Sequence, residues 1–232
     1  MSSVRLRFIS WLIERHPRAY FRWKRIGKHR LCEDREFLAQ HAAALRAGEA
    51  LQVLEERYNL WALTRAVTRL PGACAEVGVY RGGSAKFIAA AKGDAPLHLF
   101  DTFGGMPAVN PATDGAFYAG QFDRTSLAFV QRYLAGYAGV HFHPGFFPES
   151  ARPLEAEPMS FKFVHLDVDI RASTLAALEW FYPRMVPGGV ILTHDYNDVT
   201  VPGTKSAFDA FFTDKPETVV PLWFTQAVVT KA

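Results

Sequence analysis

The sequence predicts an α/β fold of the Rossmann-like, doubly wound kind: a mostly parallel, seven-stranded sheet that ends in an antiparallel hairpin, with an N-terminal helical extension. Three observations predict it. After Gly72, short apolar runs alternate with helical segments, as in parallel strands joined by crossover helices. Most of these runs are continuously apolar, which is typical of strands buried on both faces. The last two runs are almost adjacent, and so short a connection joins only antiparallel strands.

Residues 1–70 are predicted to form the helical extension, and residues 71–232 the α/β domain. Residues 33–70 carry apolar side chains near the helical period, so we expect two helices that cover the ligand pocket or one sheet face. Residues 1–30 hold nine Lys or Arg against one acid, Glu14, and several aromatic residues lie among them. This basic arm would contact an anionic membrane, nucleic acid or an acidic partner, or pack on a second subunit in a homodimer. Because no motif that reads nucleic-acid sequence occurs, we expect no nucleic-acid partner.

Within the α/β domain, each strand is predicted from a short apolar run and each helix from a helical apolar period between two runs. The stretch 102–124 is rich in Gly, Pro and Asn and too long for an ordinary connection, so it is a candidate lid or substrate loop. Strands are expected at residues 73–79, 97–101, 140–143, 161–169, 190–195, 218–224 and 226–230, and helices at residues 84–91, 126–137, 172–185 and 205–212.

Length and composition limit the class of protein. A chain of 232 residues, 49% of them hydrophobic, is long enough for one substantial core and short for two. The two cysteines, Cys32 and Cys74, suit neither a disulfide scaffold nor a thiolate metal site. No apolar run approaches the roughly 20 residues that cross a bilayer, and residues 8–13 are too short for a signal-peptide core. We therefore expect a cytoplasmic protein.

A glycine-rich turn follows the first predicted strand, where open α/β sheets bind ligands. Residues 76–84 read Glu-Val-Gly-Val-Tyr-Arg-Gly-Gly-Ser, and the glycines let the backbone turn sharply and approach a ligand. The spacing Gly-x-x-x-Gly-Gly differs from the Gly-x-Gly-x-x-Gly of dinucleotide sites, which favours a cofactor without a pyrophosphate. Candidate cofactor contacts in this turn are Glu76, Gly78, Tyr80, Gly82, Gly83 and Ser84.

S-adenosylmethionine fits this pattern. Backbone amides at the N-terminus of the next helix can bind its carboxylate, and Glu76 can receive its ammonium group. Asp101 ends the second predicted strand, where a carboxylate can accept both ribose hydroxyls. Gly145 and Phe146, after the third strand, are candidates to border the adenine ring, although the phenylalanine suits an ordinary core equally well.

Acidic residues end the next two predicted strands. Asp167 and Asp169 close the first, and His194 and Asp195 close the second. If these strands are neighbours, their ends lie about 5 Å apart, so Asp167 and Asp195 can share Mg²⁺ or another hard divalent cation. Such a cation would orient a substrate hydroxyl and lower its pKa for attack on the sulfonium methyl group. Asp167 or His194 would accept the proton, and His194 can instead bind the metal.

Several of these residues also have a structural interpretation. Helix capping or loop hydrogen bonding accounts for Asp169 more readily than for Asp195. His141, His143 and His165 lie in or near strands and are interpreted as structural. Asp167-x-Asp169 also matches the metal motif of sugar-nucleotide glycosyltransferases, although so short a motif is frequent by chance.

Five stretches together resemble the macrocin O-methyltransferase family. They are residues 76–84, Phe-Asp-Thr-Phe-Gly-Gly-Met-Pro at 100–107, Gly-Phe-Phe-Pro-Glu-Ser at 145–150, Leu-Asp-Val-Asp at 166–169 and His-Asp-Tyr at 194–196. The resemblance spans roughly residues 56–212, and Asp-Thr-Phe-x-Gly-Met-Pro is its most specific element. It implies a class I methyltransferase domain and a metal-dependent enzyme that methylates sugar hydroxyls in antibiotic biosynthesis.

The resemblance also implies roles for individual residues. Asp167 and Asp195 would hold Mg²⁺. Phe103, in the same element as Thr102, is a further candidate cofactor contact. The residues that would contact S-adenosylmethionine by this resemblance are Glu76, Gly78, Gly82, Ser84, Asp101 and Thr102.

The chain departs from the family at two positions. The family usually shows two aspartates before the tyrosine, where this chain has His194 and Asp195, and it often has an aromatic residue at the position of Ile170. The first departure would weaken Mg²⁺ binding, recruit a softer metal, or leave a metal-free enzyme with His194 as the base. Two alternatives to a methyltransferase stay open: a metal-dependent glycosyltransferase, and a non-catalytic, membrane-associated protein that acts through its basic arm.

Overall fold

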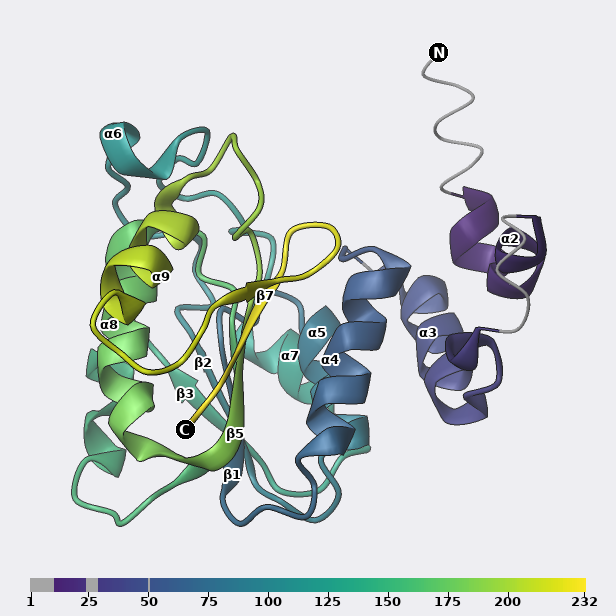
Figure 1. Ribbon diagram of the computed structural model, residues 1–232, viewed down its shortest axis with the longest axis horizontal. Coiled ribbons are helices and arrows are strands. Elements are labelled where there is room, and N and C mark those ends of the chain that lie inside the picture. The colour runs from purple at the N-terminus through teal and green to yellow at the C-terminus, as the bar shows by residue number, and fades with distance from the viewer. Residues whose placement is uncertain (1–10, 24–28, 50) are drawn as a thin grey trace.

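The computed structural model describes residues 11–23, 29–49 and 51–232, and its centre is a seven-stranded sheet with the order β3-β2-β1-β4-β5-β7-β6 (Figure 1). The first five strands are parallel to one another, and β7 is antiparallel to both β5 and β6. The predicted fold class is therefore confirmed. The strands are β1 (Ala73–Val77), β2 (Leu97–Asp101), β3 (Val140–Pro144), β4 (Phe161–Leu166), β5 (Met185–Thr193), β6 (Val220–Pro221) and β7 (Ala227–Thr230).

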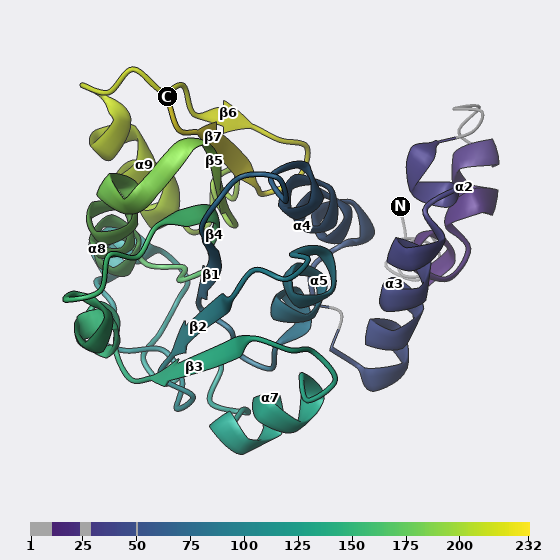
Figure 2. The same cartoon turned by 90° about the horizontal axis from the view of Figure 1, so that it is seen from below.

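Helices cover both faces of the sheet (Figures 1 and 2). α8 and α9 lie on one face, and α4, α5 and α7 lie on the other, with α3 packed outside α4 and α5. The helices are α2 (Pro17–Trp23), α3 (Arg35–Ala47), α4 (Leu54–Ala66), α5 (Gly83–Ala91), α6 (Pro111–Asp114), α7 (Leu127–Tyr133), α8 (Arg171–Phe181) and α9 (Gly203–Phe212), with short 3-10 helices at Arg30–Cys32, Glu149–Leu154 and Tyr182–Arg184.

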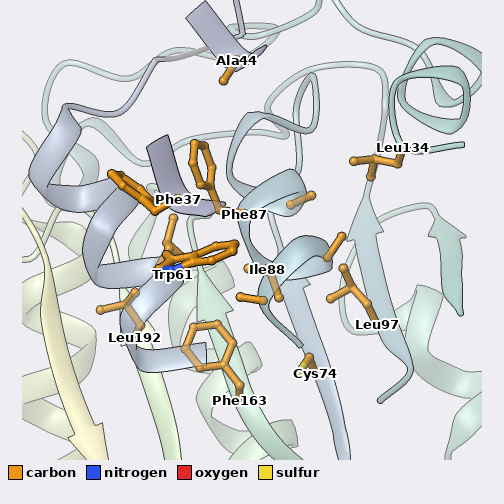
Figure 3. Packing of buried hydrophobic residues seen from close by; sticks show 14 of the residues in the cluster. Phe37, Ala44, Trp61, Cys74, Phe87, Ile88, Leu97, Leu134, Phe163 and Leu192 are labelled. Carbon is orange, nitrogen blue, oxygen red and sulfur yellow. The ribbon is translucent and has the colours of Figure 1, made fainter. Parts of the chain in front are cut away.

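The core on the α4 and α5 face includes side chains from the N-terminal extension (Figure 3). Phe37 of α3 and Trp61 of α4 are almost fully buried and pack with Phe87 of α5 over Phe163 of β4. The Trp61 indole Nε1–H donates to Asp34, the N-cap of α3, at 2.8 Å. Burial of such aromatic side chains contributes roughly 1.5–3 kcal/mol each, so α3 and α4 share the core of the sheet. The predicted division of the chain at residue 70 stays a prediction.

Several predicted elements differ in extent from those observed. The strand expected at residues 161–169 ends at Leu166, and the helix expected at residues 126–137 ends at Tyr133. Three further differences have a local physical reason. β5 begins at Met185, five residues before the expected Val190, because Pro187, Gly188 and Gly189 lie within the strand although they read as a turn. The helix before it ends at Phe181, since the Tyr182-Pro183 step continues as a 3-10 turn. β6 is only Val220–Pro221, and proline cannot donate to a ladder.

The basic arm is described only in part, because residues 1–10 and 24–28 lie outside the described residues. Within the described part, residues 11–15 and Pro17–Trp23 are helical, and Phe21 is buried against this chain, stacked on His29 with 4.6 Å between ring centroids. No helix in the described ranges is long and apolar enough to cross a membrane. Membrane contact through residues 1–30 and a homodimer through this region stay predictions.

Candidate active site

A cavity of about 590 Å³ opens at the carboxyl ends of β1, β2, β4 and β5. This is the edge at which open α/β sheets bind ligands, and the volume is within the usual range for small-molecule sites. The glycine turn after β1 and the acids after β4 and β5 form its floor, and residues from the predicted lid, between Gly105 and Phe122, form one wall. Another wall comes from Glu49, residues 51–53, Glu56 and Arg57, before and within α4.

The lid is anchored to the body of the protein through Asp114 of α6. This buried carboxylate accepts hydrogen bonds from the backbone N–H of Asn110 at 2.7 Å and of Arg171 at 2.9 Å. Arg171 begins α8, whose N-cap, Ile170, has no side-chain acceptor. Asp114 therefore supplies the acceptor that the helix start lacks and fixes the lid over the cavity. Asp169, for which the structural interpretation is helix capping or loop hydrogen bonding, is not the N-cap of α8.

The glycine turn has backbone angles and close contacts that require glycine. Gly78 and Gly82 have φ values of 85° and 82°, and Gly82 is the N-cap of α5. A Cβ on Gly78 would lie 1.9 Å from the backbone oxygen of Asp167, and one on Gly83 would lie 2.2 Å from that of Glu49. The turn is thus pressed between the end of β4 and the N-terminal segment. This close approach explains the glycines and joins the predicted cofactor turn to the acidic residues.

Asp101 holds the same turn in place. Its Oδ2 accepts from the backbone N–H groups of Val79 at 2.6 Å and Tyr80 at 2.8 Å, and its Oδ1 accepts from Phe103 at 2.6 Å. A carboxylate offers about four acceptor positions, so most of its capacity serves the loop. This second task of Asp101 was not predicted from the sequence.

Most of the predicted cofactor contacts come together at the cavity, but three do not line it. Glu76 is fully buried behind the turn, the Cα of Gly82 faces Val130 and Tyr133 of α7, and Phe103 is partly buried and packs against the core. The predicted residues that line the cavity are Gly78, Tyr80, Gly83, Ser84, Asp101, Thr102, Gly145 and Phe146. Whether any of the eleven contacts the cofactor stays a prediction.

Glu76 has a buried histidine as its partner. Its Oε1 lies 2.8 Å from Nδ1 of His165, and neither side chain is exposed. Burial raises the pKa of Glu76 to about 8 and lowers the pKa of His165 to about 4. The two side chains therefore form a neutral, hydrogen-bonded pair behind the cofactor turn near neutral pH. His98 and His143 form a second histidine contact away from the cavity, at 3.0 Å between Nδ1 and Nε2.

The acids after β4 and β5 meet around one imidazole. The two strands are neighbours, as the sequence interpretation required. Nδ1 of His194 lies 2.9 Å from Oδ1 of Asp195 and 3.4 Å from Oδ1 of Asp167. One ligand atom from each of these three residues lies within 4.8 Å of the others. Asp169 and Asp195 have positive φ values of 64° and 59°, which is unusual for residues other than glycine and is often found at functional sites.

The charges of this cluster are strongly perturbed. Burial raises the pKa of Asp169 well above its ordinary value, and the charge of Asp167 adds to the effect. Burial also raises the pKa of Asp167, although His194 opposes the shift. The pKa of His194 is well above its usual range because the attraction of Asp167, Asp195 and Glu56 outweighs its burial. Three carboxylates, those of Asp167, Asp195 and Glu56, thus lie within 3.4 Å of one imidazole, which is a surplus of negative charge.

The N-terminal segment contributes three polar residues that sequence reasoning missed. Glu49 receives two hydrogen bonds from the Arg81 guanidinium, at 2.6 and 2.7 Å. Gln52 Nε2 donates to Oδ2 of Asp167 at 3.2 Å, and Glu56 Oε2 lies 3.4 Å from Nε2 of His194. In the sequence these residues read as the polar face of a helix and its start, and no local pattern marks them as part of a site.

The residues present fit both groups that the fold and the acids suggest. The cavity joins backbone amides at the start of α5, the carboxylate of Asp101 and the aromatic ring of Phe146, which suit the amino-acid, ribose and adenine parts of S-adenosylmethionine. Two carboxylates and an imidazole within 4.8 Å suit a divalent cation. The surplus of negative charge there is what such a cation would compensate.

Two curated proteins resemble part of this chain in sequence. An 8-demethyl-8-(2,3-dimethoxy-α-L-rhamnosyl)-tetracenomycin-C 4'-O-methyltransferase of Streptomyces olivaceus is 32% identical over 143 residues, which cover 55% of this chain and 54% of that protein. A mycinamicin III 3''-O-methyltransferase of Micromonospora griseorubida is 30% identical over 147 residues, or 55% of this chain and 56% of that protein. The chain spans about half the length of these curated relatives.

Solved structures share the fold at low identity. The calicheamicin methyltransferase CalS11 superposes with a TM-score of 0.68 at 20% identity, covering 83% of this chain and 85% of that one. The O-methyltransferase NovP gives 0.65 at 22% identity, covering 78% and 81%. An O-methyltransferase from Bacillus cereus, solved in complex with SAH, gives 0.57 at 14% identity, covering 85% and 91%.

The matched family model covers most of the α/β domain. The model described as macrocin-O-methyltransferase (TylF) matches residues 59–219, from α4 to the segment before β6. The matched range includes the glycine turn, Asp101 and the acids after β4 and β5. The chain therefore belongs to the macrocin-O-methyltransferase family.

Proposed function

We propose that this protein is an S-adenosylmethionine-dependent O-methyltransferase that acts on a hydroxyl group of a sugar or a related secondary metabolite, assisted by a divalent cation. The observation that carries the proposal is that the glycine turn with Asp101 and the acid cluster line one cavity in a chain of this family. The names of the curated relatives support the acceptor class, since they specify O-methylation of a rhamnosyl tetracenomycin and of mycinamicin III.

The proposed cofactor site lies along the turn 78–84. There, S-adenosylmethionine would supply an electrophilic methyl group on its sulfonium. The first amides of α5 would bind its carboxylate, and the remaining acceptor position of Asp101 would bind a ribose hydroxyl. Because Gly78 packs directly against the backbone of Asp167, the turn would hold the methyl donor beside the acids that handle the acceptor.

Asp167 is the residue that we propose as the proton acceptor. Its carboxylate lines the cavity, whereas both ring nitrogens of His194 face carboxylates. Asp167, His194 and Asp195 would hold a divalent cation, which would supply Lewis acidity toward the acceptor hydroxyl. Gln52 donates to Oδ2 of Asp167 and would fix the orientation of the carboxylate toward the acceptor.

The two other functions are less well supported. A sugar-nucleotide glycosyltransferase would use Asp167 and Asp169 for a nucleotide diphosphate, but the family assignment does not favour it. A purely non-catalytic, membrane-associated role would leave the strained turn and the acid cluster without a purpose.

Isothermal titration calorimetry tests the proposal. We expect S-adenosylhomocysteine, the product form of the cofactor, to bind the wild-type protein with one site, and UDP-glucose not to bind. Binding of UDP-glucose alone would favour the glycosyltransferase, and binding of neither ligand would contradict a catalytic role for this cavity.

A further inference from the structure

Glu56 lies in the first turn of α4 and connects three separate segments through one carboxylate. Its Oε1 accepts from the backbone N–H of Thr225 at 3.2 Å and from the Thr225 hydroxyl at 2.6 Å. Its Oε2 accepts from the backbone N–H of Val53 at 3.1 Å and lies 3.4 Å from Nε2 of His194. Only 3% of the residue is exposed, so this charge is buried against the histidine. His194 is the largest influence that lowers the pKa of Glu56, and together with the hydrogen bonds from Thr225 and Val53 it overcomes the effect of burial.

This arrangement sets the direction of the imidazole ring. With Nε2 toward Glu56, the other nitrogen, Nδ1, points to Oδ1 of Asp195 and Oδ1 of Asp167, at 2.9 and 3.4 Å. Metal-binding histidines commonly donate their second ring N–H to a carboxylate, which fixes the tautomer and makes the ligand nitrogen more basic. Glu56 and His194 have the arrangement of such a carboxylate–histidine pair, as an ion-pair contact of 3.4 Å in which Nε2 makes no hydrogen bond of normal geometry with any described residue.

Two residues of this arrangement, Glu56 and Thr225, lie outside the matched family region. The family model begins at residue 59 and ends at residue 219, so it includes neither Glu56 nor Thr225. The buried carboxylate that faces His194 is therefore supplied from outside the matched region.

We propose that Glu56 is a positioning residue that holds His194 as a nitrogen ligand through Nδ1, so that the site takes a cation by two carboxylates and one imidazole. Imidazole ligands suit Zn²⁺ and similar transition metals, whereas Mg²⁺ prefers oxygen ligands. The site therefore favours a cation that accepts nitrogen over Mg²⁺ more strongly than an all-carboxylate site does. This inference rests on the metal assistance in the proposed function.

The test is calorimetric titration of Zn²⁺ and of Mg²⁺, each alone, into wild type, His194→Asp and Glu56→Gln. We expect the ratio of Zn²⁺ affinity to Mg²⁺ affinity to fall at least about tenfold in His194→Asp. In Glu56→Gln we expect Zn²⁺ binding to weaken by roughly 10–100-fold, as it does when a ligand loses its carboxylate partner. Any Zn²⁺ bound by the separate histidines His98 and His143 remains in all three proteins and cancels in the comparison.

Thr225→Val is the matched control. It removes the hydroxyl hydrogen bond to Oε1 of Glu56 but leaves Oε2 and His194 in place, so we expect the Zn²⁺ preference of wild type. If Thr225→Val and Glu56→Gln behave alike, Glu56 acts only through the stability of the fold, and its positioning role is overturned. An unchanged Zn²⁺ preference in His194→Asp overturns the nitrogen ligand itself.

A titration of S-adenosylhomocysteine in each variant separates this inference from the proposed function. We expect its affinity to be unchanged, because neither Glu56 nor His194 belongs to the glycine turn. Normal binding of this ligand without binding of either cation overturns the inference and leaves methyl transfer standing. If Glu56→Gln loses this ligand and its fold, Glu56→Asp replaces it. That variant keeps the negative charge, but its shorter side chain places the carboxylate farther from Nε2 of His194. We therefore expect its preference for Zn²⁺ over Mg²⁺ to be lower than that of wild type.

Discussion

Oε1 of Glu76 lies 2.8 Å from Nδ1 of His165, and both side chains are completely buried directly behind the turn that begins α5. The pair joins β1 to β4, whose register places Glu76 opposite His165. When both side chains are neutral, one proton between Oε1 and Nδ1 forms the hydrogen bond. Neither side chain then carries a buried charge.

The pH dependence of stability tests this pair. Burial raises the pKa of Glu76 from 4.5 to about 8, so the unfolded state loses its proton first as the pH rises. The contribution of Glu76 to the free energy of unfolding is fully present below pH 4.5. It is lost as the pH rises from 4.5 to 8. Glu76→Gln cannot titrate and keeps a donor toward Nδ1. We expect its free energy of unfolding to gain at least about 1.4 kcal/mol relative to wild type between pH 5 and pH 8, measured by urea denaturation. If the free energies of unfolding of the two proteins change in parallel with pH, Glu76 is ionised in the folded state.

Asp101→Asn tests both roles of the carboxylate after β2, which are to hold the glycine turn and to bind the ribose. The variant loses the charge that receives the backbone N–H groups of Val79 and Tyr80, and hydrogen bonds to charged groups contribute about 1.5–3 kcal/mol each. We expect a lower melting temperature together with S-adenosylhomocysteine binding that is weaker by about tenfold or more, equivalent to one lost hydrogen bond of roughly 1.4 kcal/mol. Thermal unfolding and calorimetry measure the two effects. A variant that melts earlier but binds normally would remove Asp101 from the ribose site.

A pair of glycine substitutions separates steric contact from backbone strain. Gly78 and Gly93 both have positive φ values, but an added Cβ meets the Asp167 oxygen at 1.9 Å in the first case and nothing within 4 Å in the second. Gly93→Ala should cost only the left-handed strain of about 1–2 kcal/mol. We expect Gly78→Ala to cost more than about 4 kcal/mol or to prevent folding. Equal losses in urea denaturation would show that the turn is not pressed against β4.

Asp167→Asn tests the proton acceptor. The amide cannot take the hydroxyl proton, so we expect methyl transfer to fall by roughly 10²–10⁴-fold while S-adenosylhomocysteine still binds. Single-turnover transfer of a labelled methyl group to an acceptor that wild type methylates measures the first effect, and calorimetry measures the second. His194→Asn is the comparison variant. A larger loss of transfer in that protein than in Asp167→Asn would assign the proton to the histidine.

Sequence reasoning succeeded where one local pattern decides the structure. Continuous apolar runs identified the strands, and the acids at their ends could be brought together because neighbouring parallel strands end at one edge. The start of β5 at Met185 was missed, because Pro187, Gly188 and Gly189 have the composition of a turn and only pairing in the sheet makes them a strand.

The N-terminal wall of the site could not be predicted in the same way. Gln52 and Glu56 contact Asp167 and His194 across more than a hundred residues of chain, and only the packing of α4 on the sheet creates these contacts. The same holds for Asp101. Its position at the end of a strand marked it as a ligand for the cofactor, but its hydrogen bonds to the turn depend on the turn's final conformation.

A crystal structure of the complex with S-adenosylhomocysteine is the most direct test of the central claim, which is that the turn after β1 holds the methyl donor beside the acids of β4 and β5. We predict that the amino-acid end lies on the first amides of α5, that the ribose lies next to Asp101, and that the sulfur points toward Asp167. An adenosyl ligand bound outside this cavity, or a sulfur directed away from Asp167, would contradict it.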